Sequence, residues 1–278
     1  MDALLTRLKL PGIRSTYRDW IERAAQEELS YADFLAALLQ EEWAARQESQ
    51  LRTRIRQAAL PVMRTIEQFD FTLRPELKRQ VVLRYLDPGF IASATTLVFI
   101  GAPGLGKTHL AVAIALKMLQ LGFTARFVSV QSLATSLLRC REVESRQKLI
   151  NPLLGADVLI LDELGSIPTD PRLGPVLYEL IAGRYEKKPA IITSNKSLSE
   201  WGGIFQDTSL AAALLDRLLH HGDIYHFKGP SYRLKGKTPI EHLPSRANAV
   251  DASEPDDTGQ HASIREAPEP KEVITASS

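Results

Sequence analysis

Runs of apolar residues alternate with longer stretches of helical spacing over most of the chain after residue 95. The apolar runs occupy 96–100, 125–130, 157–161, 190–194 and 224–227, and the helical stretches between them occupy 107–121, 131–149, 173–186 and 209–220. Strands that alternate with helices form βαβ units, whose strands pair in parallel and whose helices cover both faces of the sheet. The pattern therefore predicts an α/β domain built on a parallel sheet.

The first 66 residues have a different pattern, which indicates helices without strands. Leu35, Leu38 and Leu39 recur at the spacing of a helix, and few turn-forming residues precede Pro61. Because proline does not continue a helix, Pro61 is expected to end one long helix. The sequence thus predicts a small all-helical N-terminal domain ahead of the α/β domain.

Positive charge is concentrated near the end of this helical region. Only one acid, Glu48, accompanies the five arginines between 45 and 64, which are Arg46, Arg52, Arg54, Arg56 and Arg64. Such a stretch is compatible with DNA binding, but it also fits a solvated helix face whose arginine stems cover apolar surface. Residues 1–243 carry 31 basic and 26 acidic residues, an excess too mild to decide between these readings.

The rest of the composition narrows the class of protein. The chain has no run of about 18 apolar residues, and its first residues, MDALLTRLKLPG, lack the apolar centre of a signal peptide, so a cytoplasmic protein is expected. Cys140 is the only cysteine, which excludes an intramolecular disulfide and a thiolate metal cluster. From Pro244 onward, seven acidic and three basic residues stand among Pro, Ser and Ala, and this acidic tail is predicted to be disordered.

A glycine-rich loop follows the first predicted strand. Residues 101–108 read Gly101-Ala102-Pro103-Gly104-Leu105-Gly106-Lys107-Thr108 and match the phosphate-binding pattern G-x-x-x-x-G-K-[ST]. The glycines let backbone N–H groups wrap phosphates at the positive end of the following helix. In this role Lys107 lies against the β- and γ-phosphates and the Thr108 hydroxyl binds Mg²⁺, so the loop predicts a nucleoside triphosphate site.

Two carboxylates follow the apolar run at 157–161. Asp162 and Glu163 are expected at the carboxyl edge of the sheet, where open α/β sheets bind their ligands. Asp162 would hold Mg²⁺ through its water shell, and Glu163 would orient and deprotonate the attacking water. An acidic pair after a strand is common by chance, but together with the upstream loop it predicts ATP hydrolysis.

Polar residues also end the next apolar run, in the order Thr193-Ser194-Asn195. If this strand neighbours the strand that carries Asp162, these side chains lie beside the two carboxylates. Asn195 is then predicted to contact the γ-phosphate and the attacking water, with Thr193 or Ser194 as alternatives. An ordinary strand-to-turn sequence would look the same in isolation.

The last helical stretch contains Arg217 among leucines. An arginine in this setting either pairs with Asp216 or another neighbour, or turns toward another molecule. His220 and His221 follow it, and because two adjacent histidines on a helix are not expected to face one metal ion, they are interpreted as surface residues at the helix end.

A basic segment closes the region predicted to be ordered. It contains Ser231-Tyr232-Arg233 with Lys228, Lys235 and Lys237 nearby. Arg233 is positioned in sequence to reach a bound nucleotide or a nucleic-acid phosphate. A solvated terminal strand is the alternative interpretation.

Taken in this order, the motifs resemble those of an AAA+ ATPase, and more closely those of the IstB-like transposition helpers. The resemblance covers residues 4–237 and rests on the segments Leu8-Lys9-Leu10-Pro11-Gly12, Gly106-Lys107-Thr108-His109-Leu110-Ala111, Leu161-Asp162-Glu163-Leu164-Gly165, Arg184-Tyr185-Glu186, Thr193-Ser194-Asn195, Glu200-Trp201-Gly202, Leu215-Asp216-Arg217-Leu218 and Ser231-Tyr232-Arg233-Leu234. It implies an AAA+ P-loop domain at 67–243, with a linker and a leading helix at 67–95. No C-terminal lid is evident after 237, and the helical domain at 1–66 would serve DNA binding and assembly.

The same resemblance implies the function. The chain would be an ATP hydrolase that uses Mg²⁺, assembles into a homo-oligomer, binds double-stranded DNA and regulates an IstA-like transposase. ATP would contact residues 101–109, Asp162 and Arg233, and Arg217 would act on ATP held by the neighbouring subunit. A DnaC-type helicase loader is the nearest alternative. A P-loop kinase is a second class of protein, but it would not need Glu163. A scaffold that binds ATP and turns over little is a third class, and an ATP turnover assay with and without duplex DNA would distinguish it from an ATP-driven helper.

Overall fold

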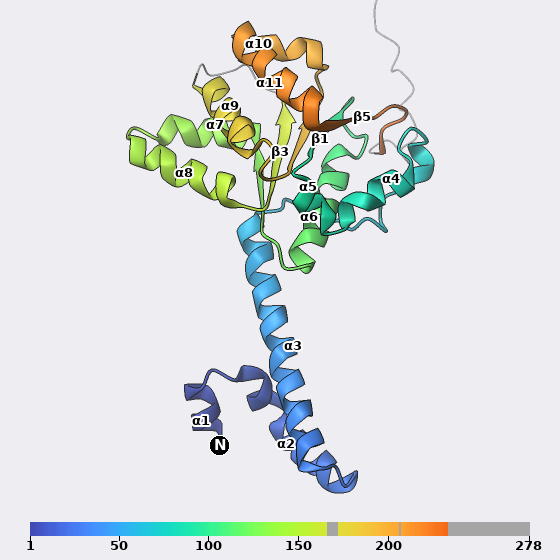
Figure 1. Ribbon diagram of the computed structural model, residues 1–278, viewed down its shortest axis with the longest axis vertical. Helices are drawn as coiled ribbons and strands as arrows, with labels where there is room; N and C mark the ends of the chain where they lie inside the picture. Colours follow the sequence, from blue (N-terminus) through green and yellow to red (C-terminus); the bar gives the residue numbers. More distant parts are fainter. Residues whose placement is uncertain (166–171, 206, 233–278) are drawn as a thin grey trace, which may run out of the picture. The chain divides into compact units, whose positions relative to one another are not determined.

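The computed structural model describes residues 1–165, 172–205 and 207–232, and within them five strands form one parallel sheet (Figure 1). Its strands, in the spatial order β2-β3-β4-β1-β5, are β1 (Thr96–Ile100), β2 (Ala125–Ser129), β3 (Val158–Leu164), β4 (Ala190–Ser194) and β5 (Gly222–His226). The predicted parallel sheet is confirmed. β3 runs three residues further than the apolar run that predicted it, through both carboxylates.

Helices cover both faces of this sheet. One face packs against α7 (Val130–Arg139), α8 (Val143–Gly155), α9 (Leu173–Arg184), α10 (Trp201–Phe205) and α11 (Thr208–His221), and the other against α4 (Arg79–Leu83), α5 (Gly89–Ser93) and α6 (Lys107–Gln120). Successive residues of a strand point to opposite faces of the sheet. Val98 therefore packs in the core beneath α7 to α11, and Leu97 and Phe99 pack in the core beneath α4 to α6. Short 3₁₀ turns lie at η1 (Phe71–Leu73), η2 (Arg84–Leu86) and η3 (Leu198–Glu200).

Two predicted helices are each divided in the structure. The stretch expected at 131–149 consists of α7 and α8, and Glu142 begins α8 by forming a capping box with Ser145. The long N-terminal helix is also interrupted. It comprises α2 (Pro11–Gln26) and α3 (Tyr31–Ala58), preceded by the short α1 (Asp2–Arg7). The Ser30 hydroxyl accepts a hydrogen bond from the Asp33 amide and starts α3, which ends at Ala58, shortly before Pro61.

The N-terminal helices have a small core of their own. Leu5, Ile13 and Leu38 are buried together, and α2 lies so close to α3 that a Cβ on Gly12 would be 2.7 Å from the Glu41 carbonyl oxygen. Glu42 is buried where the two helices meet, and its carboxylate accepts hydrogen bonds from the amide of Gly12 at 2.8 Å. This contact satisfies a free donor at the start of α2, whose first two residues are Pro11 and Gly12.

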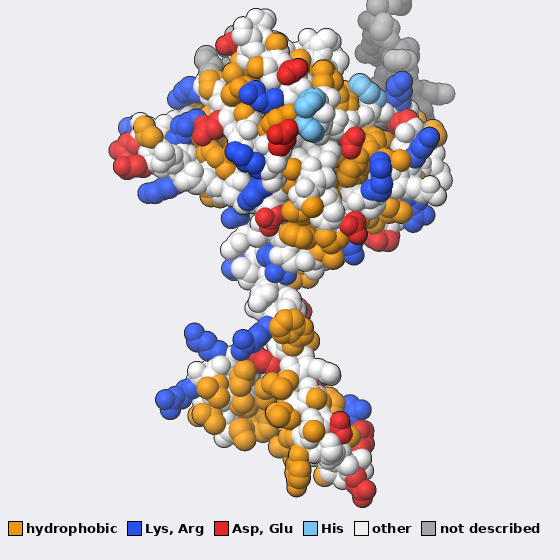
Figure 2. Space-filling model, in the orientation of Figure 1, with side chains coloured by type: hydrophobic (Ala, Val, Ile, Leu, Met, Phe, Trp, Pro, Cys, Tyr) orange, Lys and Arg blue, Asp and Glu red, His pale blue; other side chains and the backbone are white. Residues whose placement is uncertain are grey.

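Apolar side chains also remain on the surface of the N-terminal helices. Figure 2 shows hydrophobic side chains gathered over this region, and the exposed ones include Leu4, Leu8, Leu35, Leu39 and Trp43. Two of the three leucines whose spacing predicted a helix, Leu35 and Leu39, are therefore exposed, and only Leu38 belongs to the core. The helical spacing was correct, but most of the apolar face that it marked is not buried within the chain.

The last turns of α3 belong to the core of the α/β domain. Ala58 is fully buried in that core, and Leu51 and Ile55 pack against it. Arg126 on β2 donates to the carbonyl oxygen of Gln57. One helix therefore contributes to both the N-terminal core and the α/β core.

Three predictions fall outside the described residues: the disorder of the tail from 244 onward, the position of Arg233, and the lack of a lid after 237. None of the helices in the described ranges combines the length and apolar character that crossing a membrane requires.

Candidate nucleotide-binding and hydrolysis site

The phosphate-binding loop joins β1 to α6 in a conformation that depends on glycine. Gly101, Gly104 and Gly106 have positive φ angles of 153°, 80° and 96°, which residues with a Cβ rarely adopt. Lys107 begins α6, and its Nζ donates to the carbonyl oxygens of Gly101 and Ala102 at 2.6 and 2.8 Å. These bonds hold the ammonium group against the loop expected to wrap the phosphates.

A bulge at the end of β3 turns two consecutive carboxylates toward one site. Between Leu161 and Leu164, β3 has one residue more than the matching stretch of β4, and Glu163 has φ 61°. In a regular strand the side chains of consecutive residues point to opposite faces, and a bulge changes that direction. Asp162 is 6% exposed and bonded to Thr108, whereas Glu163 is exposed and lines the cavity beside the phosphate-binding loop.

Asp162 is the centre of a hydrogen-bond network between neighbouring strands. Its Oδ1 accepts from Thr108 Oγ1 at 2.8 Å and from Thr193 Oγ1 at 2.7 Å. The backbone amide of Glu163 donates to the same Thr193 hydroxyl at 2.9 Å. This network fixes the relative positions of the loop helix and the ends of β3 and β4.

The donor set at this point fits Mg²⁺. Thr108 and Asp162 offer only oxygen atoms, and Mg²⁺ is typically bound by one or two carboxylates together with substrate phosphates and waters. Their hydroxyl and carboxylate already lie 2.8 Å apart at the end of the phosphate-binding loop. Thr108 and Asp162 are the residues that would hold such an ion.

The three polar residues at the end of β4 have different environments. Thr193 is fully buried and lines the cavity through the network with Asp162. The Ser194 hydroxyl donates to the Leu164 carbonyl oxygen at 2.7 Å, so it supports the bulge. Asn195 is exposed and lines the cavity. Of the alternatives that the sequence left open, Asn195 and Thr193 are the two that face the site.

The site is a cavity of about 520 Å³. Its lining includes the loop residues 103–109, with Glu163, Thr193 and Asn195 on the sheet side; Gly101, Ala102 and Asp162 act through contacts to these residues. The His109 ring is bonded through Nε2 to the Thr65 carbonyl oxygen at 3.0 Å. The cavity volume falls within the range of ordinary ligand pockets.

Part of the cavity wall was not predicted from the sequence. It comes from the segment after α3 and from the end of the described chain, and its residues are Pro61, Val62, Arg64, Gln68 and Tyr232. No sequence motif marks residues 61–68 as part of the site. For Tyr232, the only sequence signal was the basic segment that contains Ser231-Tyr232-Arg233. The structure shows Tyr232 at the site, while Arg233 lies outside the described residues.

A buried arginine supports this wall. Arg74 is fully buried, and it donates to the carbonyl oxygens of Leu105 at 3.0 Å and Pro230 at 2.7 Å. Its guanidinium lies 4.8 Å from the centre of the Tyr232 ring, and the Tyr232 amide donates to the Gly104 carbonyl oxygen at 2.9 Å. Arg74 thus ties the phosphate-binding loop to the chain after β5, a role that has no sequence signal because its partners are backbone atoms.

Arg217 lies on α11 and is not among the residues that line the cavity. Its Nη1 donates to the Tyr178 hydroxyl of α9 at 2.7 Å, and its guanidinium lies 5.2 Å from the centre of that ring. Within the described part of the chain it forms no ion pair, with Asp216 or any other acid. No carboxylate in ranges 1–165, 172–205 and 207–232 therefore forms an ion pair with this half-buried guanidinium.

The four arginines considered for DNA binding lie along α3, but their charges are not all available. Arg46 pairs with Glu42 at 2.7 Å, and Arg52 pairs with Glu48. Arg56 is exposed, whereas Arg54 is partly buried and its Nε has no hydrogen-bond partner among the residues described. The alternative interpretation, a solvated helix face, therefore fits part of this arginine-rich surface.

The fold and the site are those of an ATP-binding P-loop protein of the AAA+ class. The defining features are the glycine loop after β1, the Thr–Asp pair, the second carboxylate and the strand order β5-β1-β4-β3-β2. The chain belongs to the family of IstB-like ATP binding proteins, whose family model matches residues 3–239. The fold class and the family expected from the sequence are both confirmed.

The relatives have names that refer to insertion sequences. The chain is 37% identical to an ATP-binding protein of insertion sequence IS21 from Pseudomonas aeruginosa, over 94% of this chain and 98% of that protein. It is 38% identical to the corresponding protein of IS5376 from Geobacillus stearothermophilus, over 83% and 92% of the two chains. Among solved structures, AMPPCP-bound DnaA from Aquifex aeolicus is similar with a TM-score of 0.50 and 20% identity, over 61% of this chain and 51% of that chain; this likeness concerns the fold alone.

Proposed function

We propose that this protein hydrolyses ATP and acts as a self-assembling, DNA-binding helper of the transposase encoded by its insertion sequence. One observation carries the proposal: an intact set of hydrolytic groups converges on one cavity, in a chain whose relatives are named for insertion sequences. A protein that only bound nucleotide would not need a second carboxylate, Glu163, turned into that cavity.

Each group has a defined part in the reaction. Lys107 neutralises charge on the β- and γ-phosphates, and Asn195 orients the attacking water near the γ-phosphate. Glu163 takes a proton from that water as it attacks. Mg²⁺, held by Thr108 and Asp162, would supply further neutralisation of phosphate charge. Thr193 positions both carboxylates, since it donates to Asp162 and accepts from the Glu163 amide.

Arg217 is proposed to complete the site of a neighbouring subunit. Members of the AAA+ class bind ATP at subunit junctions, and Arg217 does not line the cavity of its own chain. Its bond to Tyr178 orients the guanidinium through a hydroxyl rather than a carboxylate. An arginine that enters the site from another subunit would make hydrolysis depend on assembly.

DNA binding is assigned to the N-terminal region, residues 1–66, and ATP hydrolysis to residues 67–243. Assembly would repeat the arginines of α3 around the DNA, so that modest charge per chain yields many phosphate contacts. The Arg52–Glu48 ion pair is exposed on both sides and carries little stability, so Arg52 is free to exchange its carboxylate for a phosphate. Arg46 is held by the buried carboxylate of Glu42 and is less available.

The test is a reconstituted strand-transfer reaction with the transposase of the same insertion sequence, a target duplex and this protein. We expect strand transfer to rise when protein and ATP are both present, and ATP turnover to rise when duplex DNA is added. A helicase loader would instead place a replicative helicase on single-stranded DNA and leave strand transfer unchanged. That outcome, with ATP turnover intact, would refute the transposition role while keeping the ATPase.

A further inference from the structure

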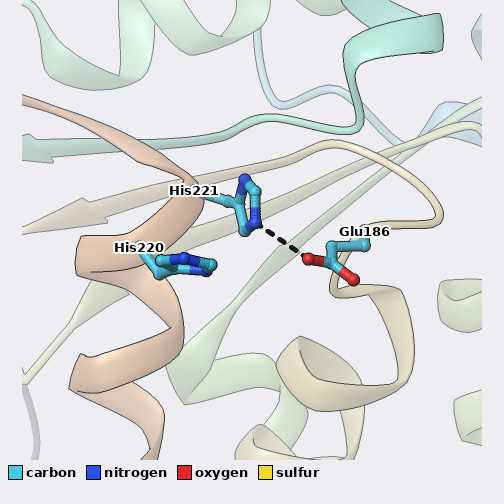
Figure 3. A group of neighbouring side chains, drawn as sticks. All are labelled: Glu186, His220 and His221. Carbon is cyan, nitrogen blue, oxygen red and sulfur yellow. Dashed lines mark ion pairs between the residues drawn. The ribbon is translucent and has the colours of Figure 1, made fainter.

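A cluster of metal-ligating side chains lies where the ends of α9 and α11 meet. Glu186 follows α9, and His220 and His221 are the last two residues of α11 (Figure 3). One ligand atom from each residue lies within 4.8 Å of the other two, and all three side chains are exposed. Two imidazoles and one carboxylate are a donor set typical of transition-metal ions such as Zn²⁺.

The sequence predicted that His220 and His221 are surface residues at a helix end, and both are exposed at the end of α11. His221 is the final helical residue, and Gly222 has the extended angles φ −107° and ψ 143°. The two rings are 4.2 Å apart between centroids, at an interplanar angle of 78°. Successive side chains diverge by about 100° along a regular helix, yet one ligand atom of each of these two residues lies within 4.8 Å of the other and of the Glu186 carboxylate.

Neighbouring groups orient the ligands. The Tyr185 hydroxyl is bonded to His220 Nδ1 at 2.8 Å, which leaves Nε2 of this ring for an ion. His221 Nε2 lies 2.8 Å from Glu186 Oε1, as the dashed line in Figure 3 shows. An outer partner on the second nitrogen of a histidine is a regular feature of metal sites, because it fixes the ring and the tautomer.

We propose that Glu186, His220 and His221 bind a Zn²⁺ ion, with water completing its coordination, and that the ion ties the end of α11 to the loop after α9. The ion would replace the direct contact between His221 and Glu186. That pair is about half exposed on both sides, so its loss costs the fold little.

The site would stabilise the part of α11 that carries Arg217. Positions 220 and 221 are three and four residues after Arg217, so all three side chains lie along one side of the helix. The Arg217–Tyr178 bond already joins α11 to α9. A metal ion one turn further on would be a second tie between the same two helices.

The experiment is calorimetric titration of ZnCl₂ into the full chain, made without a polyhistidine tag and stripped of metal with a chelator. We expect one site per chain whose affinity falls at least about tenfold in each of Glu186→Ala, His220→Ala and His221→Ala. His226→Ala is the matched control, because His226 is an exposed histidine of β5 outside the cluster, and its variant should bind like the parent. Tyr185→Phe should weaken binding by about tenfold through the lost partner of His220.

A second measurement separates binding from general effects on folding. Saturating Zn²⁺ should raise the melting temperature of the parent and of His226→Ala, and leave the three ligand variants unchanged. Co²⁺ should give visible absorption bands only in the chains that bind Zn²⁺. The proposal is overturned if the parent binds no Zn²⁺, or if Glu186→Ala and His221→Ala bind it as tightly as the parent does.

Discussion

The nucleotide cavity and helix α3 are both candidate phosphate-binding surfaces, and they are built in opposite ways. In the cavity, Asp162 and Thr193 are buried and bonded to each other, and the loop offers backbone groups held by glycine geometry. On α3, the arginines lie along the surface, and Arg52 is paired with an acid one turn away.

This difference sets the size of effect expected from each residue. A group that is buried in a network cannot be replaced by water, so its removal changes both chemistry and geometry. An exposed arginine is screened by salt and shares its role with neighbours, so its removal changes binding by a small increment. We therefore expect the largest effects from the groups that act on bound nucleotide, among which the proposal includes Arg217 of a neighbouring subunit, and the smallest on α3.

The largest effect is expected for Arg217→Ala, at about 10³–10⁵-fold in the rate of ATP hydrolysis. Its charge is not balanced by any carboxylate of the described chain, and the proposal places it against the γ-phosphate in another subunit. The measurement is phosphate release at saturating ATP and at protein concentrations where the parent assembles.

A mixing experiment shows in which subunit Arg217 acts. Lys107→Ala subunits keep the arginine, and Arg217→Ala subunits keep an intact cavity, so a mixture should regain activity that neither has alone. Tyr178→Phe is the control for positioning, since it removes the bonded hydroxyl and keeps the ring. Co-assembled mixtures that stay inactive would return Arg217 to a structural role between α9 and α11.

The next effect concerns Glu163→Gln, for which hydrolysis should fall by about 10²–10⁴-fold while ATP binding persists. The amide keeps the size and the backbone bond to Thr193 but does not accept the water's proton. Lys107→Ala is the comparison, because it should lose ATP binding itself. Binding of a fluorescent ATP analogue and phosphate release measure the two properties, and parental hydrolysis by Glu163→Gln would show that another group is the base.

The residues at the centre of this cavity could be located from the sequence because their signals are local. Apolar runs place the strands, and the loop at 101–108 and the pair Asp162-Glu163 follow two of them directly. What the sequence did not predict depends on tertiary contacts. The bulge that turns Glu163 toward the cavity needs β4 beside it, and Arg74 is recognised only once Leu105 and Pro230 lie next to it.

Helix ends also differ in whether the sequence signals them locally. The start of α3 has a local signal, Ser30 followed by Asp33, which the apolar spacing concealed. The meeting of His220, His221 and Glu186 has none, since it arises where the ends of two helices come together. Sequence patterns thus locate groups within one element, and the structure is needed where elements converge.

A smaller effect is expected on the stability of the N-terminal helices from Glu42→Gln. Burial raises the pKa of Glu42, but hydrogen bonds from Arg46 and from the amides of Ile13 and Gly12 outweigh burial and hold its pKa below the ordinary value. Replacing the charge should cost about 1.5–3 kcal/mol, the contribution of a hydrogen bond to a charged group. Amide hydrogen exchange of Gly12 and Ile13 measures it directly.

The pH dependence of this effect follows from the lowered pKa. A carboxylate whose folded pKa lies below its unfolded value stabilises the fold fully above the unfolded pKa, and the contribution is lost as the pH falls through the folded pKa. The gap between the parent and Glu42→Gln should therefore be largest at neutral pH and shrink in acid. Glu48→Gln, on the exposed pair with Arg52, is the control and should show little change at any pH; a gap that persists in acid would contradict this account.

The smallest effects are expected for DNA binding, and they test whether the arginines of α3 contact phosphate. The double reversal Arg52→Glu and Arg56→Glu should weaken binding of duplex DNA. The slope of log affinity against log salt should fall by about 0.9 for each phosphate that the protein no longer neutralises. ATP affinity should not change, because neither residue lines the cavity. Fluorescence anisotropy with ATP at several salt concentrations measures both the affinity and the slope.

The matched control for this double reversal is Arg23→Glu, because Arg23 forms the same kind of exposed pair, with Glu27, on α2 outside the arginine-rich stretch. If the double reversal and the control bind DNA with the parental slope, α3 is a solvated helix face, and the DNA contacts must be sought on the α/β domain. If both variants weaken binding equally, the effect is one of net charge rather than of a surface on α3. Only a weakening confined to the reversal of Arg52 and Arg56 would place phosphate contacts on this helix.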